Sequence, residues 1–369
     1  MQFNTVQGAN RPYTAVLLVP TGIGAAIGGY AGDALPVAKA IAQVVDCLIT
    51  HPNVLNGAQL YWPLPNALYV EGYGLDQFAA GAWGLAPVHR NRIGLILDQG
   101  IEPDLRVRQL QAAEAVRATL GLELTDYVIT DAPLGVELQT AASGATWGTI
   151  AQPDSLLRAA ERLIHQVGAD AIAVVARFPD DLDSTALQDY RQGQGVDPLA
   201  GAEAVISHLI VRQFRVPCAH APALAPLPLD ANISPRSAAE EIGYTFLPCV
   251  LVGLSRAPQF VARDACAPTP RSQPALWADQ VDAVIVPETA FGGSAVLHFG
   301  QRRLGAPAPL IIAVQDNATT LHVTPETVGI TAVRASSYLE AIGMVVAHRA
   351  GLRLDALRAA IAPLWPHQA

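Results

Sequence analysis

Charged residues are scarce in this chain of 369 residues: Lys, Arg, Asp and Glu together make up 15 % of it, against about a quarter in an average soluble domain. With 51 % apolar residues, the chain can bury a large core, which excludes intrinsic disorder. The net charge of −9 excludes a nucleic-acid binder, which needs a basic face to meet phosphates. Because so little charge is available to cover the surface, we expect another subunit to cover part of it, in a homo-oligomer.

Cysteine is equally sparse. The four cysteines are far apart and form no C-x-x-C pair, which excludes a disulfide framework and a zinc ribbon. The N-terminus lacks the basic and then apolar pattern of a signal peptide. One uncharged stretch, 13–32, is long enough to span a bilayer, but its five glycines make a poor helix. We therefore expect a cytoplasmic protein with no membrane or nucleic-acid partner and no metal site.

Short apolar runs alternate with amphipathic segments along most of the chain. Runs rich in Val, Ile, Leu and Ala are expected to be strands buried on both faces of a parallel sheet: 14–19, 46–50, 67–71, 93–98, 127–130, 171–176, 283–286, 310–314 and 330–333. Segments with helical periodicity are expected at 33–45, 104–120, 154–167, 198–213, 234–253 and 336–350. This alternation predicts an α/β protein with mostly parallel sheets and flanking helices.

Two segments interrupt the alternation and suggest a division of the chain. Residues 179–196 are polar and acidic and are expected to form an exposed loop or lid, and residues 217–230 contain four prolines, which favour extended structure. We expect an N-terminal α/β lobe at 1–178, a connecting region at 179–235 and a C-terminal α/β lobe at 236–369. The resulting prediction is two Rossmann-like lobes with a cleft between them.

The first candidate site is a glycine-rich stretch, VPTGIGAAIGGYAGD, which follows the first expected strand and precedes a helix. Exposed backbone N–H groups at such a turn attract an anion, so we expect Gly22, Gly24, Gly28 and Gly29 to bind a substrate phosphate or carboxylate. The spacing is not G-x-G-x-x-G, and the second strand does not end in the acidic residue that holds a dinucleotide ribose. NAD is therefore disfavoured, and a tight packing turn is the alternative interpretation.

Polar residues follow several of the expected strands, at the edge where open α/β sheets bind ligands. His51 and Asp98 are expected to be catalytic, because histidine and carboxyl groups exchange protons in acid–base catalysis. Asn53, Glu71 and Asp131 lie at the same edge and are expected to contact substrate. Each has an alternative as a turn or helix-capping residue, and the sequence does not separate acid–base chemistry from cation binding.

A second glycine pair closes a similar stretch near the C-terminus. The sequence VPETAFGGSA follows the strand expected at 283–286, much as VPTG follows the first strand. A polar cluster, QDNATT, follows the next strand. The residues expected to act here are Glu288 as a catalytic group and Gly292, Gly293, Ser294, Asp316 and Asn317 as substrate contacts.

Two further motifs carry weaker signals. Cys218 and His220 are two apart, a spacing that suits a metal or a thiolate–imidazole pair, but no third ligand is near in the sequence. The stretch SPRSAAEE at 234–241 begins with hydroxyls, an arginine and free N–H groups, which suit an anion. These motifs identify no cofactor.

Taken together, the motifs resemble an uncharacterised family found in cyanobacteria and plastids, a domain of unknown function. The resemblance covers most of the chain and rests on the glycine loop at 22–33, THPN at 50–53, DDLDS at 180–184, CAHAP at 218–222, SPRSAAEE at 234–241 and PETAFGGS at 287–294. It implies a soluble housekeeping role in a photosynthetic cell, in pigment or cofactor metabolism. It implies no particular activity, cofactor or catalytic residue.

We expect an enzyme that acts by acid–base chemistry on a small anionic metabolite, phosphorylated or carboxylated, bound between the two lobes. The residue types suit an isomerase, lyase or transferase better than a dehydrogenase. Two alternatives stay open: a nucleotide-cofactor oxidoreductase that uses the first glycine loop, and a non-catalytic scaffold or assembly factor. The enzyme hypothesis requires the two glycine-rich turns to converge on one hollow.

Overall fold

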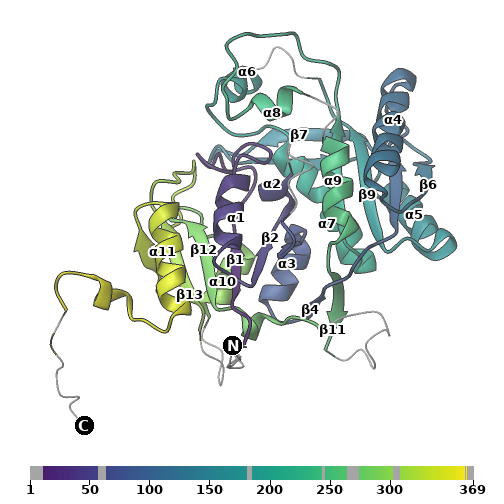
Figure 1. Cartoon of the computed structure of the whole chain (residues 1–369). Coiled ribbons are helices and arrows are strands. Elements are labelled where there is room, and N and C mark those ends of the chain that lie inside the picture. Colours follow the sequence, from purple (N-terminus) through teal and green to yellow (C-terminus); the bar gives the residue numbers. More distant parts are fainter. Residues whose placement is uncertain are drawn as a thin grey trace.

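Two parallel sheets form the framework of the protein, which confirms the predicted α/β class (Figure 1). The computed structural model describes residues 11–56, 64–180, 185–242, 246–263, 274–301, 308–361 and 363. The first sheet contains six strands: β1 (Thr14–Leu17), β2 (Cys47–Thr50), β3 (Ala67–Tyr69), β12 (Ala283–Pro287), β13 (Leu310–Val314) and β14 (Val333–Ala335). Their spatial order is β14–β13–β12–β1–β2–β3, and every neighbouring pair is parallel.

The second sheet has four parallel strands: β5 (Ile93–Leu97), β6 (Leu124–Ile129), β9 (Ala171–Arg177) and β10 (Cys218–Ala223). Their spatial order is β10–β9–β5–β6, so β10 is an edge strand. Its proline, Pro222, is tolerated there because one side of an edge strand needs no ladder hydrogen bonds. Two short antiparallel pairs complete the strands: β4 (Trp83–Ala86) with β11 (Gln259–Ala262), and β7 (Val136–Thr140) with β8 (Thr146–Ile150).

Helices cover both faces of each parallel sheet, as strands buried on both faces require. On the first sheet, α1 (Leu35–Ala42) and α11 (Tyr338–Arg349) cover one face, while α3 (Gly72–Ala79) and α10 (Ser294–Gly300) cover the other. On the second sheet, α5 (Pro153–Arg162) and α7 (Ala200–Phe214) pack on one face, and α4 (Pro103–Leu120) and α9 (Phe246–Ser255) pack on the other.

The remaining helical elements are short. They are α2 (Pro52–Leu55), α6 (Thr185–Arg191), α8 (Ala238–Glu241), a π-helical turn after α5 (Leu163–Val167) and 3-10 turns at Ala278–Gln280 and Leu354–Leu357. Residues 179–196, expected to be an exposed loop or lid, therefore carry a helix. Its last two residues, Tyr190 and Arg191, are buried.

One helical layer joins the two sheets. Side chains alternate between the faces of a strand, so Leu17 faces α1 and α11 while Val16 faces α3 and α10. Phe78 of α3 and Ile206 of α7 lie in the same core as Val16. Each fully buried Leu, Ile or Phe contributes about 1.5–3 kcal/mol, so this shared core holds the two sheets in a fixed relation.

The sheets do not follow the boundaries expected along the chain. The first sheet combines β1, β2 and β3 from residues 1–178 with β12, β13 and β14 from residues 236–369. The region expected to be a connection, 179–235, contributes β10 and α7 to the second sheet and its helical layer. The two similar stretches after β1 and β12 are spatial neighbours, because Val16 pairs with Val284 in parallel register.

Candidate functional site

Open parallel sheets bind ligands where the chain reverses its direction of growth across the sheet. In the first sheet this point lies between β1 and β12, and in the second it lies between β5 and β9. The loops that follow these strands carry the expected glycine motifs and Asp98. At both points the protein's own side chains bind the backbone N–H groups, and a hollow of about 320 Å³ remains at the second, lined by Asp98, Arg177 and Asp180.

At the first of these points, the glycine loop is closed by the segment that follows β13. The buried Asn317 side chain accepts from the Ile27 backbone N–H (2.8 Å) and donates to the Ile27 carbonyl (2.8 Å) and to the Tyr338 hydroxyl (2.7 Å). The Ala26 N–H donates to the Ala318 carbonyl at 2.9 Å. Asn317, which was expected to contact substrate, therefore ties the glycine loop to α11 through hydrogen bonds.

The anions that the glycine loop binds belong to the protein. The N–H of Gly28 donates to Asp33 Oδ1 at 2.6 Å, and the N–H of Ala31 donates to Glu240 Oε1 at 2.7 Å. Arg236 pairs with the other oxygen of Asp33 at 3.0 Å. Glycine is required at position 28, where φ is +92° and a Cβ would lie 2.5 Å from the Val19 side chain. Carboxyl groups of this chain therefore occupy amides that the sequence analysis expected to bind a substrate anion.

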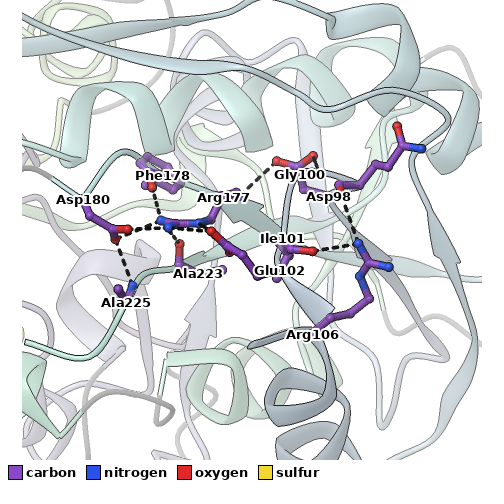
Figure 2. Close-up of polar contacts among 11 residues, drawn as sticks. Asp98, Gly100, Ile101, Glu102, Arg106, Arg177, Phe178, Asp180, Ala223 and Ala225 are labelled. Atoms are coloured by element: carbon purple, nitrogen blue, oxygen red, sulfur yellow. Dashed lines mark hydrogen bonds and ion pairs between the residues drawn. The ribbon is translucent and has the colours of Figure 1, made fainter. Parts of the chain in front are cut away.

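Asp98 lies at the corresponding point of the second sheet, where β5 ends (Figure 2). Its Oδ1 accepts from the N–H groups of Gly100 and Leu134, both at 2.9 Å, and its Oδ2 accepts from the N–H of Arg177 at 3.0 Å. The Arg177 guanidinium in turn pairs with Glu102 at 2.9 Å and with Asp180. Asp98 is thus a buried acceptor that ties loops together, and it lies apart from His51.

A cavity of about 180 Å³ lies elsewhere, at the carboxyl ends of β2 and β3 and beside β10 and α7. One water needs roughly 10–15 Å³ of such space. The cavity therefore has room for a ligand of about a dozen non-hydrogen atoms. We call it the acidic cavity. Its polar lining residues are Thr21, His51, Asn53, Asn56, Glu71, Tyr190, Arg191, Asp197, Glu203, Ser207, His208, His220, Ser237, Glu240 and Glu241.

A chain of polar contacts runs along one wall of the acidic cavity. His208 contacts Glu71 at 2.9 Å, and Glu71 accepts from the Ser207 hydroxyl at 3.4 Å. Ser207 Oγ lies 3.2 Å from His220 Nδ1, and His220 Nε2 lies 3.6 Å from Glu203. The His208 side chain is 42 % exposed whereas that of Glu71 is 3 % exposed. The chain therefore leads from solvent to a buried carboxylate.

Burial and a carboxylate partner act in opposite directions on His208. Burial alone would lower its pKa, but the hydrogen bond and the charge of Glu71 raise the pKa of His208 above its ordinary 6.5 overall. Glu71 also caps α3, since it accepts from the N–H groups of Tyr73 and Gly74. The contact with Glu71 therefore favours the protonated form of His208.

Two partly buried carboxyls of the same cavity, Asp197 and Glu240, have raised pKa values. Burial, followed by the charges of Glu240 and Glu203, raises the pKa of Asp197 well above its ordinary value. Burial also raises the pKa of Glu240 to about 7, against opposing hydrogen bonds from Tyr190 and Ala31. Carboxyls in such mutual proximity share protons, because both cannot ionise cheaply in a poorly solvated site.

Two other residues of the cavity have fixed roles. Arg191 binds Glu241 through Nε (2.8 Å) and Nη2 (3.2 Å), so its charge is matched locally. His51 Nε2 accepts from the Val19 N–H at 3.0 Å, and burial lowers the pKa of His51 to about 4. His51 is therefore neutral with its proton on Nδ1.

The cavity unites only some of the residues expected to form a site. His51, Asn53 and Glu71 line it, and Asn53 also donates to the Gly28 carbonyl at 2.5 Å. Glu288 instead pairs with Arg334. Asp131 is exposed and pairs with Arg158 at 2.7 Å; the hydrogen bonds from Arg158 and Ser155 lower its pKa.

The second glycine pair lies outside the acidic cavity. A Cβ at Gly292 would meet Val323 at 3.5 Å, and one at Gly293 would meet nothing within 4 Å. Ser294 Oγ lies 3.4 Å from the His298 ring, and Asp316 is exposed. The two glycine turns follow neighbouring strands, but only Thr21, Ala31 and other residues flanking the first one reach the cavity.

Most of the polar cavity residues were missed because they come from segments with weak motifs. Glu203 and Ser207 are four residues apart in an otherwise apolar helix, a spacing that places them on one face and that offered a signal. Asp197 precedes the same helix without any motif. Within the residues that the structure describes, no three His, Cys, Asp or Glu side chains are grouped closely enough to hold a metal ion.

Fold and site define an α/β protein with an acidic, histidine-bearing cavity beside two parallel sheets. Residues 14–358 match the family described as a protein of unknown function, DUF3326. The chain is also 64 % identical over 347 residues, 94 % of each chain, to a protein of Synechococcus sp. named an uncharacterised lipoprotein. This chain therefore belongs to the DUF3326 family, which confirms its resemblance to an uncharacterised family with cyanobacterial members. No solved structure matches it.

The name of this relative corrects one expectation. A lipoprotein carries a lipid that holds it at a membrane, so the name points to a membrane-anchored location outside the cytoplasm for that protein. The cytoplasmic location expected from composition and the sparse cysteines is therefore wrong, because the name of a relative that is 64 % identical contradicts it. Among the described helices, none combines the length and the apolar character that a membrane span needs.

Proposed function

We propose that this protein is an enzyme that transfers protons to and from a small uncharged or cationic substrate in the acidic cavity. The observation that carries the proposal is the pair of partly buried carboxyls with raised pKa values, Asp197 and Glu240, which line the same cavity as the polar chain ending at Glu203. Titratable groups whose environments hold them in different protonation states are the basis of acid–base catalysis.

The two sides of the cavity suit different roles in one proton-transfer step. A protonated carboxyl of the Asp197–Glu240 pair is the proton donor, since its raised pKa keeps a proton available near neutral pH. Glu203, supported by His220 at 3.6 Å, is the proton acceptor. Ser207, Glu71 and His208 connect that acceptor with solvent and return the site to its starting state.

His51 supports substrate orientation. Because the Val19 N–H occupies Nε2, the proton of the neutral ring is on Nδ1 and is available as a donor to a substrate oxygen. The low pKa of about 4 argues against His51 as a base, since a ring that weakly basic accepts protons poorly at neutral pH.

The charge of the cavity disfavours the anionic substrate expected from the sequence. Its lining includes five carboxyl side chains, and its one arginine is paired with Glu241. The amides that would hold a phosphate, in an anionic substrate or in a nucleotide cofactor, already donate to Asp33 and Glu240. A hydroxyl-bearing or amine-bearing substrate meets carboxylates without like-charge repulsion.

A charge-matched ligand series tests this assignment. Thermal unfolding is measured with butane-1,4-diol, butane-1,4-diamine and succinate, which share a four-carbon length and differ in charge. We expect the diol or the diamine to raise the melting temperature and succinate to leave it unchanged. Stabilisation by succinate alone would overturn the proposed charge preference.

Catalysis is tested by exchange with solvent. Small polyols, hydroxyketones and amines are incubated with the protein in deuterated water, and mass spectrometry measures deuterium at carbon. We expect one class to gain deuterium, and we expect Glu203→Gln to slow this gain by on the order of a hundredfold or more, the usual contribution of an acid–base group. The control Glu137→Gln changes an exposed residue of β7 and should behave as the wild type. Equal exchange with Glu203→Gln and wild type would remove Glu203 from the mechanism.

A further inference from the structure

We infer that two segments, 185–199 and 224–242, form a lid over the acidic cavity, and that Glu240 latches this lid to the glycine loop while its carboxyl group is protonated. The inference rests on the cavity of the proposed function and concerns its regulation. It does not depend on which reaction takes place there.

The two segments are bound to each other as one unit. Arg191, at the end of α6, donates to Glu241 of α8 (2.8 Å) and to the Pro228 carbonyl (2.8 Å), while its own carbonyl accepts from the Ser237 hydroxyl (2.8 Å). The Arg191 side chain is only 4 % exposed. In Figure 1, α6 and α8 accordingly lie side by side at one end of the molecule.

This unit covers the cavity with little regular structure of its own. Leu187 and Tyr190 from one segment and Leu227 and Glu240 from the other line the cavity. Apart from α6, residues 185–199 contain no helix or strand, and apart from α8, neither do residues 224–242. Segments with few backbone ladders open at lower cost than the sheets below them.

The lid is attached to the glycine loop by a hydrogen bond to Glu240, a pair of stacked rings and an ion pair. Glu240 Oε1 accepts from the Ala31 N–H at 2.7 Å, and the Tyr190 hydroxyl donates to the same carboxyl group. The Tyr190 ring stacks on Tyr30 with their centroids 4.6 Å apart. Arg236 adds an ion pair to Asp33 at 3.0 Å. The loop that the sequence marks as an anion site thus serves as the attachment point of the lid.

An ionised Glu240 would face mainly negative charge. Asp197 approaches it from the other lid segment, Glu203 approaches from α7, and Asp33 approaches from the glycine loop. The nearby cations, Arg236 and Arg191, are already paired with Asp33 and Glu241, and the facing phenols are those of Tyr30 and Tyr190. Loss of the proton from Glu240 therefore adds repulsion between the lid and the two elements beneath it.

The direction of the pH dependence follows from the position of this proton. The pKa of Glu240 is about 7 in the closed lid and returns toward 4.5 when the lid opens into water. The closed form binds more protons in this interval, so closure is strongest below pH 4.5 and weakens as the pH rises to about 7. Above that value both forms are ionised and the dependence ends.

Hydrogen–deuterium exchange of the intact protein measures the opening directly. Exchange is followed between about pH 5 and about pH 8, and rates are corrected for intrinsic chemical exchange. We expect the opening constant of lid peptides to rise on the order of tenfold or more across this range, while peptides of α4 change little. Glu240→Gln keeps an acceptor for Ala31 without a titrating proton, so its lid should stay as protected at high pH as the wild-type lid at low pH. Glu137→Gln should follow the wild type.

A second variant keeps the inference testable if Glu240→Gln does not fold. Tyr190→Phe removes one hydrogen bond to Glu240 and keeps the stacked ring, so its lid should open more than the wild-type lid at about pH 5. The inference is overturned if wild-type lid peptides show no pH dependence after correction, or if Glu240→Gln retains it. The exchange experiment contains no ligand, so the two proposals are tested separately. If the lid depends on pH but the ligand series fails, only the proposed function is rejected. If the ligand series succeeds but the lid does not depend on pH, only the lid is rejected.

Discussion

The end of the second sheet and the acidic cavity both gather carboxyl groups from separate segments, yet these carboxyls differ in how they are satisfied. Asp98 accepts from three backbone N–H groups, and the neighbouring Glu102 and Asp180 share the Arg177 guanidinium. Asp197 and Glu240 have fewer donors, and nearby carboxylates raise the pKa of both. A gathering of carboxyl groups is common to both regions. The supply of donors separates a carboxylate that closes loops from one that is available for chemistry.

The largest expected effect is the loss of stability on removing the satisfied carboxylate. Asp98→Ala leaves three buried N–H groups without an acceptor and should lower the free energy of unfolding by about 3–5 kcal/mol. Glu203→Gln, in the acidic cavity, should change it by less than about 1 kcal/mol, because it removes like-charge repulsion along with an ion pair. Urea denaturation of both variants measures the difference. Equal losses would mean that the two regions do not differ as argued.

An intermediate effect is expected from the two glycine pairs, which look alike in sequence. At Gly29 an added Cβ would lie 2.2 Å from the Ala25 carbonyl oxygen, so Gly29→Ala should cost about 2–3 kcal/mol. Gly293 has an extended backbone with open space around it, so Gly293→Ala should stay within about 1 kcal/mol of the wild type. Thermal unfolding of the matched pair checks this. A larger loss at Gly293 would show that the second turn is also tightly packed.

The smallest effect concerns the solvent end of the polar chain. Glu71→Gln removes the charge that raises the pKa of His208 and leaves the burial that lowers it. NMR titration should therefore find the pKa of His208 below that in the wild type. The stability from this pair is present below pH 6.5 and is lost as the pH rises through the raised pKa. It should amount to less than about 1 kcal/mol, because the His208 side chain is 42 % exposed and solvent screens it. An unchanged pKa of His208 would show that Glu71 does not raise it.

Much of the fold could be predicted from hydrophobic patterning. Each of the nine expected strands overlaps a strand of the two parallel sheets, although β14 begins only at Val333. The strands not expected, β4, β7, β8, β10 and β11, are short antiparallel partners or an edge strand. Such strands carry polar residues or proline, so they lack the continuous apolar run that marks a central parallel strand.

The site was less predictable than the fold. His51, Asn53 and Glu71 were found because they follow strands of the first sheet. Asp197 and Glu240 were not, because their raised pKa values come from burial by segments distant in the sequence. The sequence predicted that amides of the glycine loop bind a substrate anion, whereas in the structure the N–H groups of Gly28 and Ala31 donate to Asp33 and Glu240.

The sequence by itself determined the α/β class, the strands at the centre of both sheets and the turns that need glycine, because these depend on local periodicity and backbone sterics. Tertiary structure alone decided that β1 and β12 are neighbours, that Asp98 is satisfied and that three carboxyl groups from separate segments share one cavity. Desolvation and charge coupling depend on distance in space. Asp197, Glu203 and Glu240 acquire their chemistry only when the folded chain brings them together.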